Sequence, residues 1–381
     1  MQNFSPLTKC VHSGTYQDET SRGVTTPIYT SSSYRFVRGE GGVCYPRYYN
    51  IPTQKAAADK IAALENAEAA LVLASGMAAV TSSLLSLMEA GDHAVVQAGV
   101  YGGTHHFVAS EMSRFNLEFT LVSSNEPADF EAAVRDNTKV LYFETPTNPL
   151  LHVVDLDALA DLAKRRNLTS VIDNTFATPI NQNPLDHGID VVLHSGTKYL
   201  GGHSDLCCGV ALSRSELMSR IHETSVNLGG VLGAPECYRL ERSLMTLGLR
   251  MAQHNKNGLA LAEFLHGHPG VRKVYYPGLS DHPGYEIAKR QMRGFGGMLS
   301  VELDGDQDAA LAAVERLELF THAVSLGGVE SLVCFPCWTS HAKVSAEERA
   351  ALGISDSLVR VSVGIEDTND LIEDWKRALE G

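Results

Sequence analysis

The chain has 381 residues, of which 44% are hydrophobic and 20% charged, and its formal net charge is −14. This length exceeds what one hydrophobic core usually supports, so we expect a large domain and a smaller one. The composition excludes a disordered chain, and the negative charge argues against nucleic acids and anionic membranes as partners.

The first fifty residues are rich in Ser, Thr, Gly and Tyr and show little hydrophobic periodicity. They predict an extended arm, residues 1–50, that must pack on something else. Residues 1–8 lack a basic stretch followed by an apolar segment, and no apolar run is long enough to span a bilayer. We therefore expect a cytoplasmic protein with no membrane partner.

Residues 51–249 alternate helical stretches with short apolar runs, as the βα units of a mostly parallel sheet do. The predicted strands are 70–74, 93–97, 118–122, 140–143, 170–172, 191–193 and 209–212, and the predicted helices include 53–65, 76–88 and 155–166. Residues 250–381 predict a smaller α+β domain, with a helix at 251–265 and strands at 297–302 and 358–363. The fold class is therefore α/β.

Polar residues directly follow several of these apolar runs, and ligands of open α/β sheets bind at the carboxyl ends of the strands. Lys198 stands among hydroxyls and glycines just after the run 191–193, and Asp173 follows the run 170–172. We therefore expect both side chains to face one ligand. Pyridoxal 5'-phosphate (PLP) requires such a pair, because an amine forms a Schiff base with it and an anion keeps its pyridine nitrogen protonated.

Other polar and aromatic residues complete the predicted cofactor site. A strand gives way to a helix at Ser75, Gly76 and Met77, where the free amides and the helix dipole favour a phosphate. Ser195 and Thr197 can add hydroxyl donors. Tyr101 is an aromatic residue at a strand end that can stack on a planar ring, and Asn148 also follows a strand. Each feature alone is also explained by a cap, a turn or a surface lysine. Together they indicate one cofactor site.

The seven cysteines are an odd number spread over a long chain, which indicates reduced thiols. The spacing of Cys334 and Cys337 is compatible with a redox pair or with zinc ligands, but no second pair accompanies it. Two ordinary thiols are the favoured interpretation.

Seven segments, in order along the chain, are ASGMAA (74–79), VYGGT (100–104), FETPTNP (143–149), DNTF (173–176), HSGTKYLGGHSD (194–205), SLGGVESL (325–332) and LVRVSVGIED (358–367). With them the chain resembles the Cys/Met-metabolism family of PLP-dependent enzymes, which includes cystathionine synthases, cystathionine lyases and methionine γ-lyase. The resemblance covers nearly the whole length. It implies the PLP-dependent transferase fold of the aspartate aminotransferase type, fold type I.

The resemblance also implies roles for individual residues. Lys198 would be the catalytic lysine, and Tyr101 would stack on the cofactor ring and act as an acid or base near the leaving thiol. Ser75, Gly76, Met77, Ser195 and Thr197 would hold the phosphate, Asp173 would pair with the pyridinium, and Asn148 and Glu144 would lie on the ring's oxygen side. Arg360 would clamp the substrate carboxylate, with Ser325 and Asn148 also binding substrate.

Two residues of the arm, Tyr45 and Arg47, resemble a family motif that reaches across a dimer to the cofactor phosphate of the neighbouring subunit. The resemblance therefore implies a homodimer as the catalytic unit, and a tetramer as the usual assembly.

The leading function implied is a carbon–sulfur lyase that splits L-cystathionine or a related sulfur amino acid into an oxo acid, ammonia and a thiol. Three alternatives stay open: a γ-replacement synthase, a methionine γ-lyase, and a catalytically silent PLP-fold protein, which would be expected to lack Lys198 or Asp173. Val324 stands where cystathionine γ-enzymes often have glutamate, and Gly103 where methionine γ-lyases usually have cysteine. One residue is inserted near Ile51 relative to the family. The substrate is therefore open.

Overall fold

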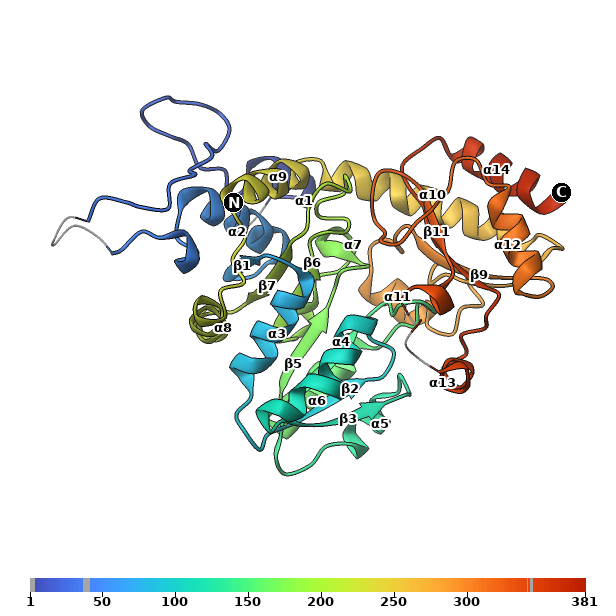
Figure 1. Cartoon of the computed structure of the whole chain (residues 1–381), viewed down its shortest axis with the longest axis horizontal. Helices are drawn as coiled ribbons and strands as arrows, with labels where there is room; N and C mark the ends of the chain where they lie inside the picture. Colours follow the sequence, from blue (N-terminus) through green and yellow to red (C-terminus); the bar gives the residue numbers. More distant parts are fainter. Residues whose placement is uncertain (1–3, 37–41, 341, 343–344) are drawn as a thin grey trace.

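The computed structural model describes residues 4–36, 42–340, 342 and 345–381. Within these residues the strands form two sheets, one at each end of the helix α10 (Leu247–His266) (Figure 1). The large sheet has seven strands in the order β1-β7-β6-β5-β4-β2-β3, and the small one has five in the order β10-β11-β12-β9-β8. This is the α/β architecture with a second, smaller sheet that the sequence predicts.

Every strand predicted for the large sheet is present within two residues of its expected bounds. The strands are β1 (Ala69–Leu73), β2 (His93–Gln97), β3 (Glu118–Val122), β4 (Thr138–Glu144), β5 (Thr169–Asp173), β6 (Val191–Ser195) and β7 (Gly209–Ser213). Strands β3, β2, β4, β5 and β6 pair in parallel, whereas β7 runs antiparallel to β6 and β1. The carboxyl ends of β4, β5 and β6 therefore lie side by side.

Helices cover both faces of the large sheet. The helices α2 (Pro52–Glu65) and α6 (Leu156–Arg166) cover one face, and α3 (Gly76–Leu87) and α8 (Ser215–Leu228) cover the other. Successive residues of a strand enter different cores: in β5, Ile172 packs on the α2 side and Val171 on the α3 side. Since side chains of a strand alternate between the two faces, strands buried on both faces are apolar throughout.

Shorter helices complete this part of the chain. They are α1 (Pro6–His12), α4 (Gly102–His106), α5 (Pro127–Ala132), α7 (Thr178–Asn181) and α9 (Ala234–Leu244), with single turns at Pro46–Tyr48, Phe107–Glu111, Met112–Phe115 and Pro184–His187.

The second sheet is built after α10. Its strands are β8 (Val271–Tyr275), β9 (Met298–Leu303), β10 (Thr321–His322), β11 (Leu332–Cys334) and β12 (Leu358–Ser362), and its other elements are α11 (Tyr285–Gln291), α12 (Gln307–Glu315), α13 (Ala346–Ala351), α14 (Thr368–Glu380) and a turn at Pro336–Trp338. Residues of α10, α12 and α14 pack on the sheet in one core, around the fully buried Trp375. The helix α10 begins four residues before the predicted start at 251, so the predicted boundary between 249 and 250 falls in its first turn.

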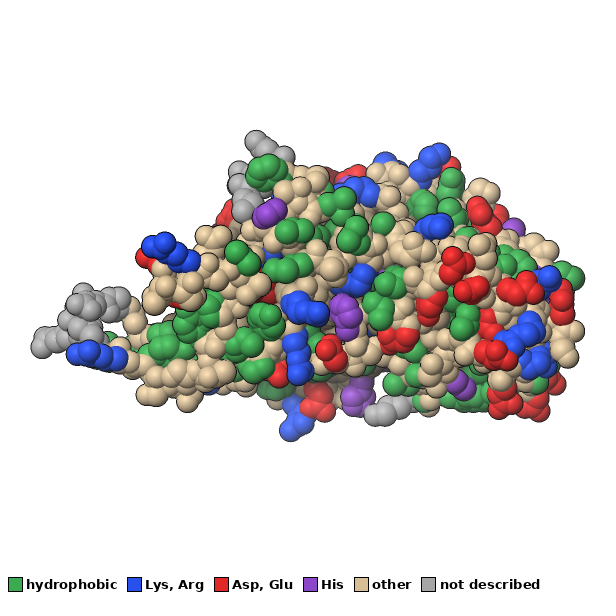
Figure 2. Space-filling model, turned by 90° about the horizontal axis from the view of Figure 1, so that it is seen from above, with side chains coloured by type: hydrophobic (Ala, Val, Ile, Leu, Met, Phe, Trp, Pro, Cys, Tyr) green, Lys and Arg blue, Asp and Glu red, His purple; other side chains and the backbone are tan. Residues whose placement is uncertain are grey.

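The N-terminal segment leaves the body of the molecule after α1 and returns at α2 (Figure 1). The helix α1, which the sequence analysis does not predict, is held there by Lys60, whose buried Nζ donates to the carbonyl oxygens of Cys10 and Val11 at 3.2 and 3.3 Å. Hydrophobic side chains gather over the narrow end of the molecule that the arm forms, while charged side chains crowd the opposite end (Figure 2). Among the described residues, no helix combines the length and apolar character needed to cross a bilayer.

Candidate active site

A cavity of about 640 Å³ opens at the carboxyl ends of β4, β5 and β6, against residues of the smaller domain. Twelve of the residues predicted for the site line it: Ser75, Gly76, Met77, Tyr101, Glu144, Asn148, Asp173, Ser195, Thr197, Lys198, Ser325 and Arg360. Asp173 and Lys198 thus share one cavity, as the sequence analysis expects.

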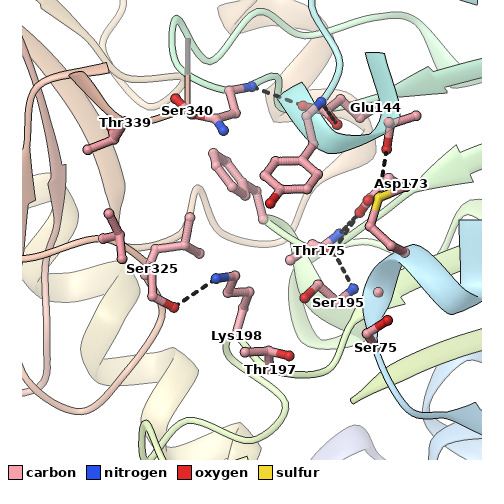
Figure 3. Close-up of a pocket in the computed structure, with 18 of the residues that line it drawn as sticks. Ser75, Glu144, Asp173, Thr175, Ser195, Thr197, Lys198, Ser325, Thr339 and Ser340 are labelled. Carbon is pink, nitrogen blue, oxygen red and sulfur yellow. Dashed lines mark hydrogen bonds between the residues drawn. The ribbon is translucent and has the colours of Figure 1, made fainter. Parts of the chain in front are cut away.

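Lys198 follows β6 and its amine points across the cavity towards the smaller domain (Figure 3). Its Nζ donates to Oγ of Ser325 at 2.7 Å. Burial, and next the positive charge of Arg360, lower the pKa of Lys198 to about 8. Ser325 has a φ of 80°, in the left-handed region that residues other than glycine rarely adopt, so its position is imposed by its surroundings. Near neutral pH the lowered pKa gives Lys198 a larger fraction of neutral, nucleophilic amine than an ordinary lysine has.

Asp173 ends β5 on the opposite side of the cavity from the lysine amine (Figure 3). Its Oδ1 accepts from both the backbone N–H (3.0 Å) and the hydroxyl of Thr175, while within the described residues its Oδ2 has no hydrogen bond. Burial raises the pKa of Asp173, and the two bonds from Thr175 act against that rise. One carboxylate oxygen is therefore left for a cationic partner in the cavity.

Glu144 ends β4 directly beside Asp173 in the sheet register. Its two oxygens accept from the backbone N–H groups of Tyr101, at 2.9 Å, and Asn148, at 3.1 Å. Burial, and next the charge of Asp173, hold the pKa of Glu144 well above its usual range. Glu144 thus fixes the backbone of two residues that line the cavity.

The other end of the cavity is formed by the first turn of α3. Ser75 caps this helix, since its Oγ accepts from the N–H of Ala78 at 3.1 Å. A Cβ on Gly76 would lie 2.9 Å from Cβ of Ser195, so only glycine lets the helix approach β6 this closely. The hydroxyl of Thr197 already bonds the backbone of Cys208. Within the described residues, the N–H groups of Gly76 and Met77 make no hydrogen bond, and with the Ser195 hydroxyl they make this end suitable for a phosphate.

Arg360 places a charged side chain of the smaller domain in the wall of the cavity. It lies on β12, and its side chain is buried although it is charged. Its Nη1 donates to Oδ1 of Asn148 at 3.1 Å, and its Nη2 donates to the carbonyl oxygen of Ser325 at 2.9 Å. A guanidinium has five N–H donors, so further donors remain for a ligand.

Tyr45 and Arg47, the two predicted residues of the arm, are not among the residues that line this cavity. Arg47 donates to the carbonyl oxygen of Val226 at 2.8 Å, and its guanidinium lies 5.1 Å from the ring centre of Tyr48. Their predicted role belongs to a neighbouring subunit and stays a prediction.

Several other residues line the cavity without having been predicted from the sequence: Thr104, Thr175, Phe176, Cys207, Trp338, Thr339 and Ser340. A sequence signal existed for Thr175, because a hydroxyl two residues after an aspartate commonly bonds it in a turn. No signal existed for Trp338 and Ser340, which lie at the end of the turn Pro336–Trp338 and just after it, and reach the cavity only through the tertiary fold.

Cys334 and Cys337 are both buried, and all seven cysteines, each within the described residues, are unpaired. Sγ of Cys334 accepts from the hydroxyl of Thr339 at 3.7 Å, and Sγ of Cys337 accepts from Nε2 of Gln307 at 3.2 Å. No group of three or more possible metal ligands occurs in the part of the chain that the structure describes.

The cavity fits one class of cofactor. Lys198, which has a lowered pKa, lies across the cavity from Asp173, which has one oxygen left for a cation. The N-terminus of α3 lies at the same cavity, where Gly76 lets it approach Ser195 closely. PLP has a reactive carbonyl, a basic ring nitrogen and a phosphate, which match these three features. The fold and the site therefore define a PLP-dependent enzyme.

Comparison with known proteins identifies the family. The family model described as Cys/Met metabolism PLP-dependent enzyme matches residues 7–380. The chain is 45% identical to cystathionine gamma-lyase of Bacillus subtilis over 376 residues, and 43% identical to cystathionine beta-lyase of Lactococcus lactis over 379 residues, with 98% of each chain covered in both comparisons. The structure of cystathionine gamma-lyase from Lactobacillus plantarum complexed with L-serine matches with a TM-score of 0.95 and 40% identity, covering 99% of each chain. The chain belongs to the Cys/Met-metabolism family of PLP-dependent enzymes, with fold type I and PLP as its cofactor.

Proposed function

We propose that the chain is a carbon–sulfur lyase that cleaves L-cystathionine or a related sulfur amino acid to an oxo acid, ammonia and a thiol. One observation supports an α-amino acid substrate above all: Lys198 and Arg360 meet on the same residue, Ser325. A carboxylate bound at Arg360 brings the Cα of the same molecule near the lysine amine. The cystathionine lyases among the similar proteins support the choice of a sulfur amino acid.

PLP, when bound, supplies an electron sink for the electron pair released at Cα of the substrate. The neutral amine of Lys198, with its pKa of about 8, removes the proton from Cα of the substrate and returns it to another atom of the substrate. Arg360 holds the carboxylate, which does not react, and so orients the Cα–H bond towards that amine. We assign Asp173 to the ring nitrogen and the first turn of α3, with Ser75 and Ser195, to the phosphate.

Tyr101 is placed to serve the leaving thiol. It precedes α4 at the edge of the cavity, its side chain is half exposed, and its backbone is held by Glu144. In this proposal its ring stacks on the cofactor and its phenol donates a proton to the departing sulfur.

Product analysis tests the reaction. Purified enzyme is offered cystathionine, methionine, cysteine, or an O-acylhomoserine with a thiol, and the products are separated. Pyruvate from cystathionine indicates β-cleavage and 2-oxobutyrate indicates γ-cleavage. Formation of cystathionine from O-acylhomoserine and cysteine, without release of an oxo acid, would contradict the lyase and favour the γ-replacement synthase.

Methionine γ-lyase is a second candidate because of Val324. This residue lines the cavity beside Ser325, its side chain is 65% exposed, and it has no charge to pair with the distal amino-acid group of cystathionine. Methanethiol and 2-oxobutyrate released from methionine faster than products from cystathionine would support this candidate.

We further propose a homodimer in which the arm completes the cavity of the neighbouring subunit, and a tetramer of two such dimers. The arm exposes many large apolar side chains, which a second copy of the chain would cover: Val24, Ile28, Phe36, Val43 and Tyr45.

The test of the dimer mixes inactive Lys198→Ala subunits with Arg47→Ala subunits. Each mixed dimer has one site with both native residues, so random mixing should restore about a quarter of the sites. No restored activity in demonstrably mixed dimers would contradict the proposal, and light scattering gives the number of subunits.

We also propose a cytoplasmic location, which the seven unpaired cysteines support.

A further inference from the structure

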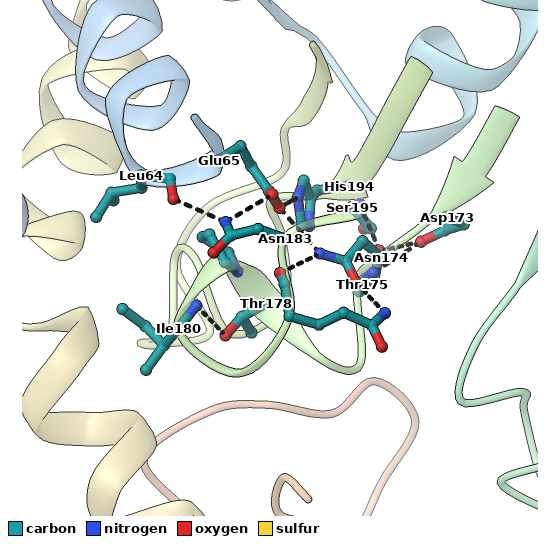
Figure 4. Close-up of polar contacts among 12 residues, drawn as sticks. Leu64, Glu65, Asp173, Asn174, Thr175, Thr178, Ile180, Asn183, His194 and Ser195 are labelled. Atoms are coloured by element: carbon teal, nitrogen blue, oxygen red, sulfur yellow. Dashed lines mark hydrogen bonds and ion pairs between the residues drawn. The ribbon is translucent and has the colours of Figure 1, made fainter. Parts of the chain in front are cut away.

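A cluster of buried polar side chains lies behind the cavity, around Glu65 at the end of α2 (Figure 4). The carboxylate is fully buried and accepts three hydrogen bonds. Its Oε1 accepts from Nε2 of His194 at 2.7 Å and from Nδ2 of Asn174 at 2.9 Å, and its Oε2 accepts from Nδ2 of Asn183 at 3.1 Å. Because a carboxylate oxygen accepts, the bond to His194 requires the imidazole proton on Nε2.

Two of these three donors are direct chain neighbours of cavity residues. Asn174 follows Asp173 at the end of β5, and His194 precedes Ser195 at the end of β6. Successive side chains of an extended chain point to opposite sides. Glu65 therefore bonds both strand ends on the side away from the cavity (Figure 4), while Asp173 and Ser195 line the cavity.

The two strand ends are also joined on the cavity side. The N–H of Ser195 donates to Oγ1 of Thr175 at 2.8 Å, and that hydroxyl in turn donates to Asp173. The N–H of Asn174 donates to the carbonyl oxygen of Leu193 at 2.9 Å. A shift of His194 along its strand would therefore move Ser195 and break its bond to Thr175, the residue that orients the Asp173 carboxylate.

The pair also acts through charge. Burial raises the pKa of Asp173, whereas the charge of His194 lowers it. Among the described residues, His194 is the only basic side chain within ion-pair distance of Glu65. A buried carboxylate is costly unless it is paired, so Glu65 holds the imidazole of His194 in a fixed place close to Asp173.

We propose that Glu65 and His194 are a positioning pair for the cofactor, which holds the ends of β5 and β6 in register and keeps Asp173 ionised towards the ring nitrogen. The pair does not touch the cavity and acts through Asp173 and Ser195. The inference rests on PLP as the cofactor and is independent of which sulfur amino acid the enzyme cleaves.

The test uses His194→Gln and Glu65→Gln, with His93→Gln as the matched control. Glutamine retains an N–H donor at a reach similar to that of Nε2 but has no imidazole ring. His93 is also fully buried, starts β2 of the same sheet and bonds Thr120 and Thr138, but it lies at the amino ends of the strands, away from the cavity. Apoprotein is titrated with PLP by equilibrium dialysis, the pH dependence of the bound cofactor's visible absorption is recorded, and thermal unfolding is followed in parallel.

We expect both cluster variants to bind PLP about tenfold more weakly. The pH midpoint of the cofactor's absorption should shift by about one unit, because one pKa unit and a tenfold change in affinity correspond to the same free energy. The control should lose thermal stability with neither effect. If the cluster variants unfold at lower temperature while PLP affinity and the pH midpoint stay native, the cluster is merely structural and the proposal is wrong. If Glu65→Gln fails to fold, His194→Gln decides by the same two readouts. These readouts do not depend on turnover, so an error in the proposed reaction leaves the test intact.

Discussion

Replacement of Arg360 tests the substrate geometry most directly. Two of its N–H groups are used by Asn148 and Ser325, and we propose that two others bind the substrate carboxylate as a fork. A hydrogen bond between charged groups contributes about 1.5–3 kcal/mol, so losing the fork should cost about 3–6 kcal/mol. Since 1.4 kcal/mol is a factor of ten, Arg360→Ala should raise KM by about 10²–10⁴.

Arg360→Lys separates charge from geometry. Lysine keeps the positive charge but cannot make the bidentate contact, so we expect its KM to lie between those of the native enzyme and the alanine variant. The positive charge of Arg360 also lowers the pKa of Lys198. In Arg360→Ala that pKa should therefore rise above about 8, whereas in Arg360→Lys it should stay closer to the native value.

Steady-state kinetics at several pH values measure both effects. Because the carboxylate does not react, kcat should fall much less than kcat/KM, provided the bound substrate keeps its orientation. A native KM in Arg360→Ala, or a loss confined to kcat, would refute the proposed clamp. The titration of Lys198, followed through the rate at which apoprotein captures PLP, is an independent readout.

Three further predictions concern the cofactor site. Lys198→Ala should abolish turnover, and borohydride treatment should then no longer fix PLP to the protein, as mass spectrometry would detect; fixation to the variant would contradict the assignment of this lysine. In the native apoprotein, covalent capture of PLP should speed up as pH rises and level off above about 8, because the reactive species is the neutral amine of Lys198; a midpoint near the ordinary value of 10.5 would be inconsistent with its burial. Thr175→Val removes the hydroxyl that bonds Asp173, which should raise the pKa of Asp173 further and weaken PLP binding about tenfold by equilibrium dialysis, whereas unchanged affinity would show that the backbone N–H bond suffices.

The sequence predicted the layered fold because the relevant signals are local. The strands of the large sheet are buried on both faces, so each appears as a short apolar run, and the intervening helices have their own periodicity. The strand ends then place Asp173 and Lys198 at the same edge, since parallel strands put their carboxyl ends together. Membership of the family followed from motifs in a fixed order.

Only the tertiary structure decided the contacts between distant segments. Arg360 reaches Asn148 across 212 positions of the chain, and Glu65 reaches His194 across 129. Neither contact leaves a periodic or local trace in the sequence, because both depend on how α2 and β12 pack against the large sheet. The lowered pKa of Lys198 has the same origin, since it comes from burial and from Arg360, which no spacing along the chain reveals.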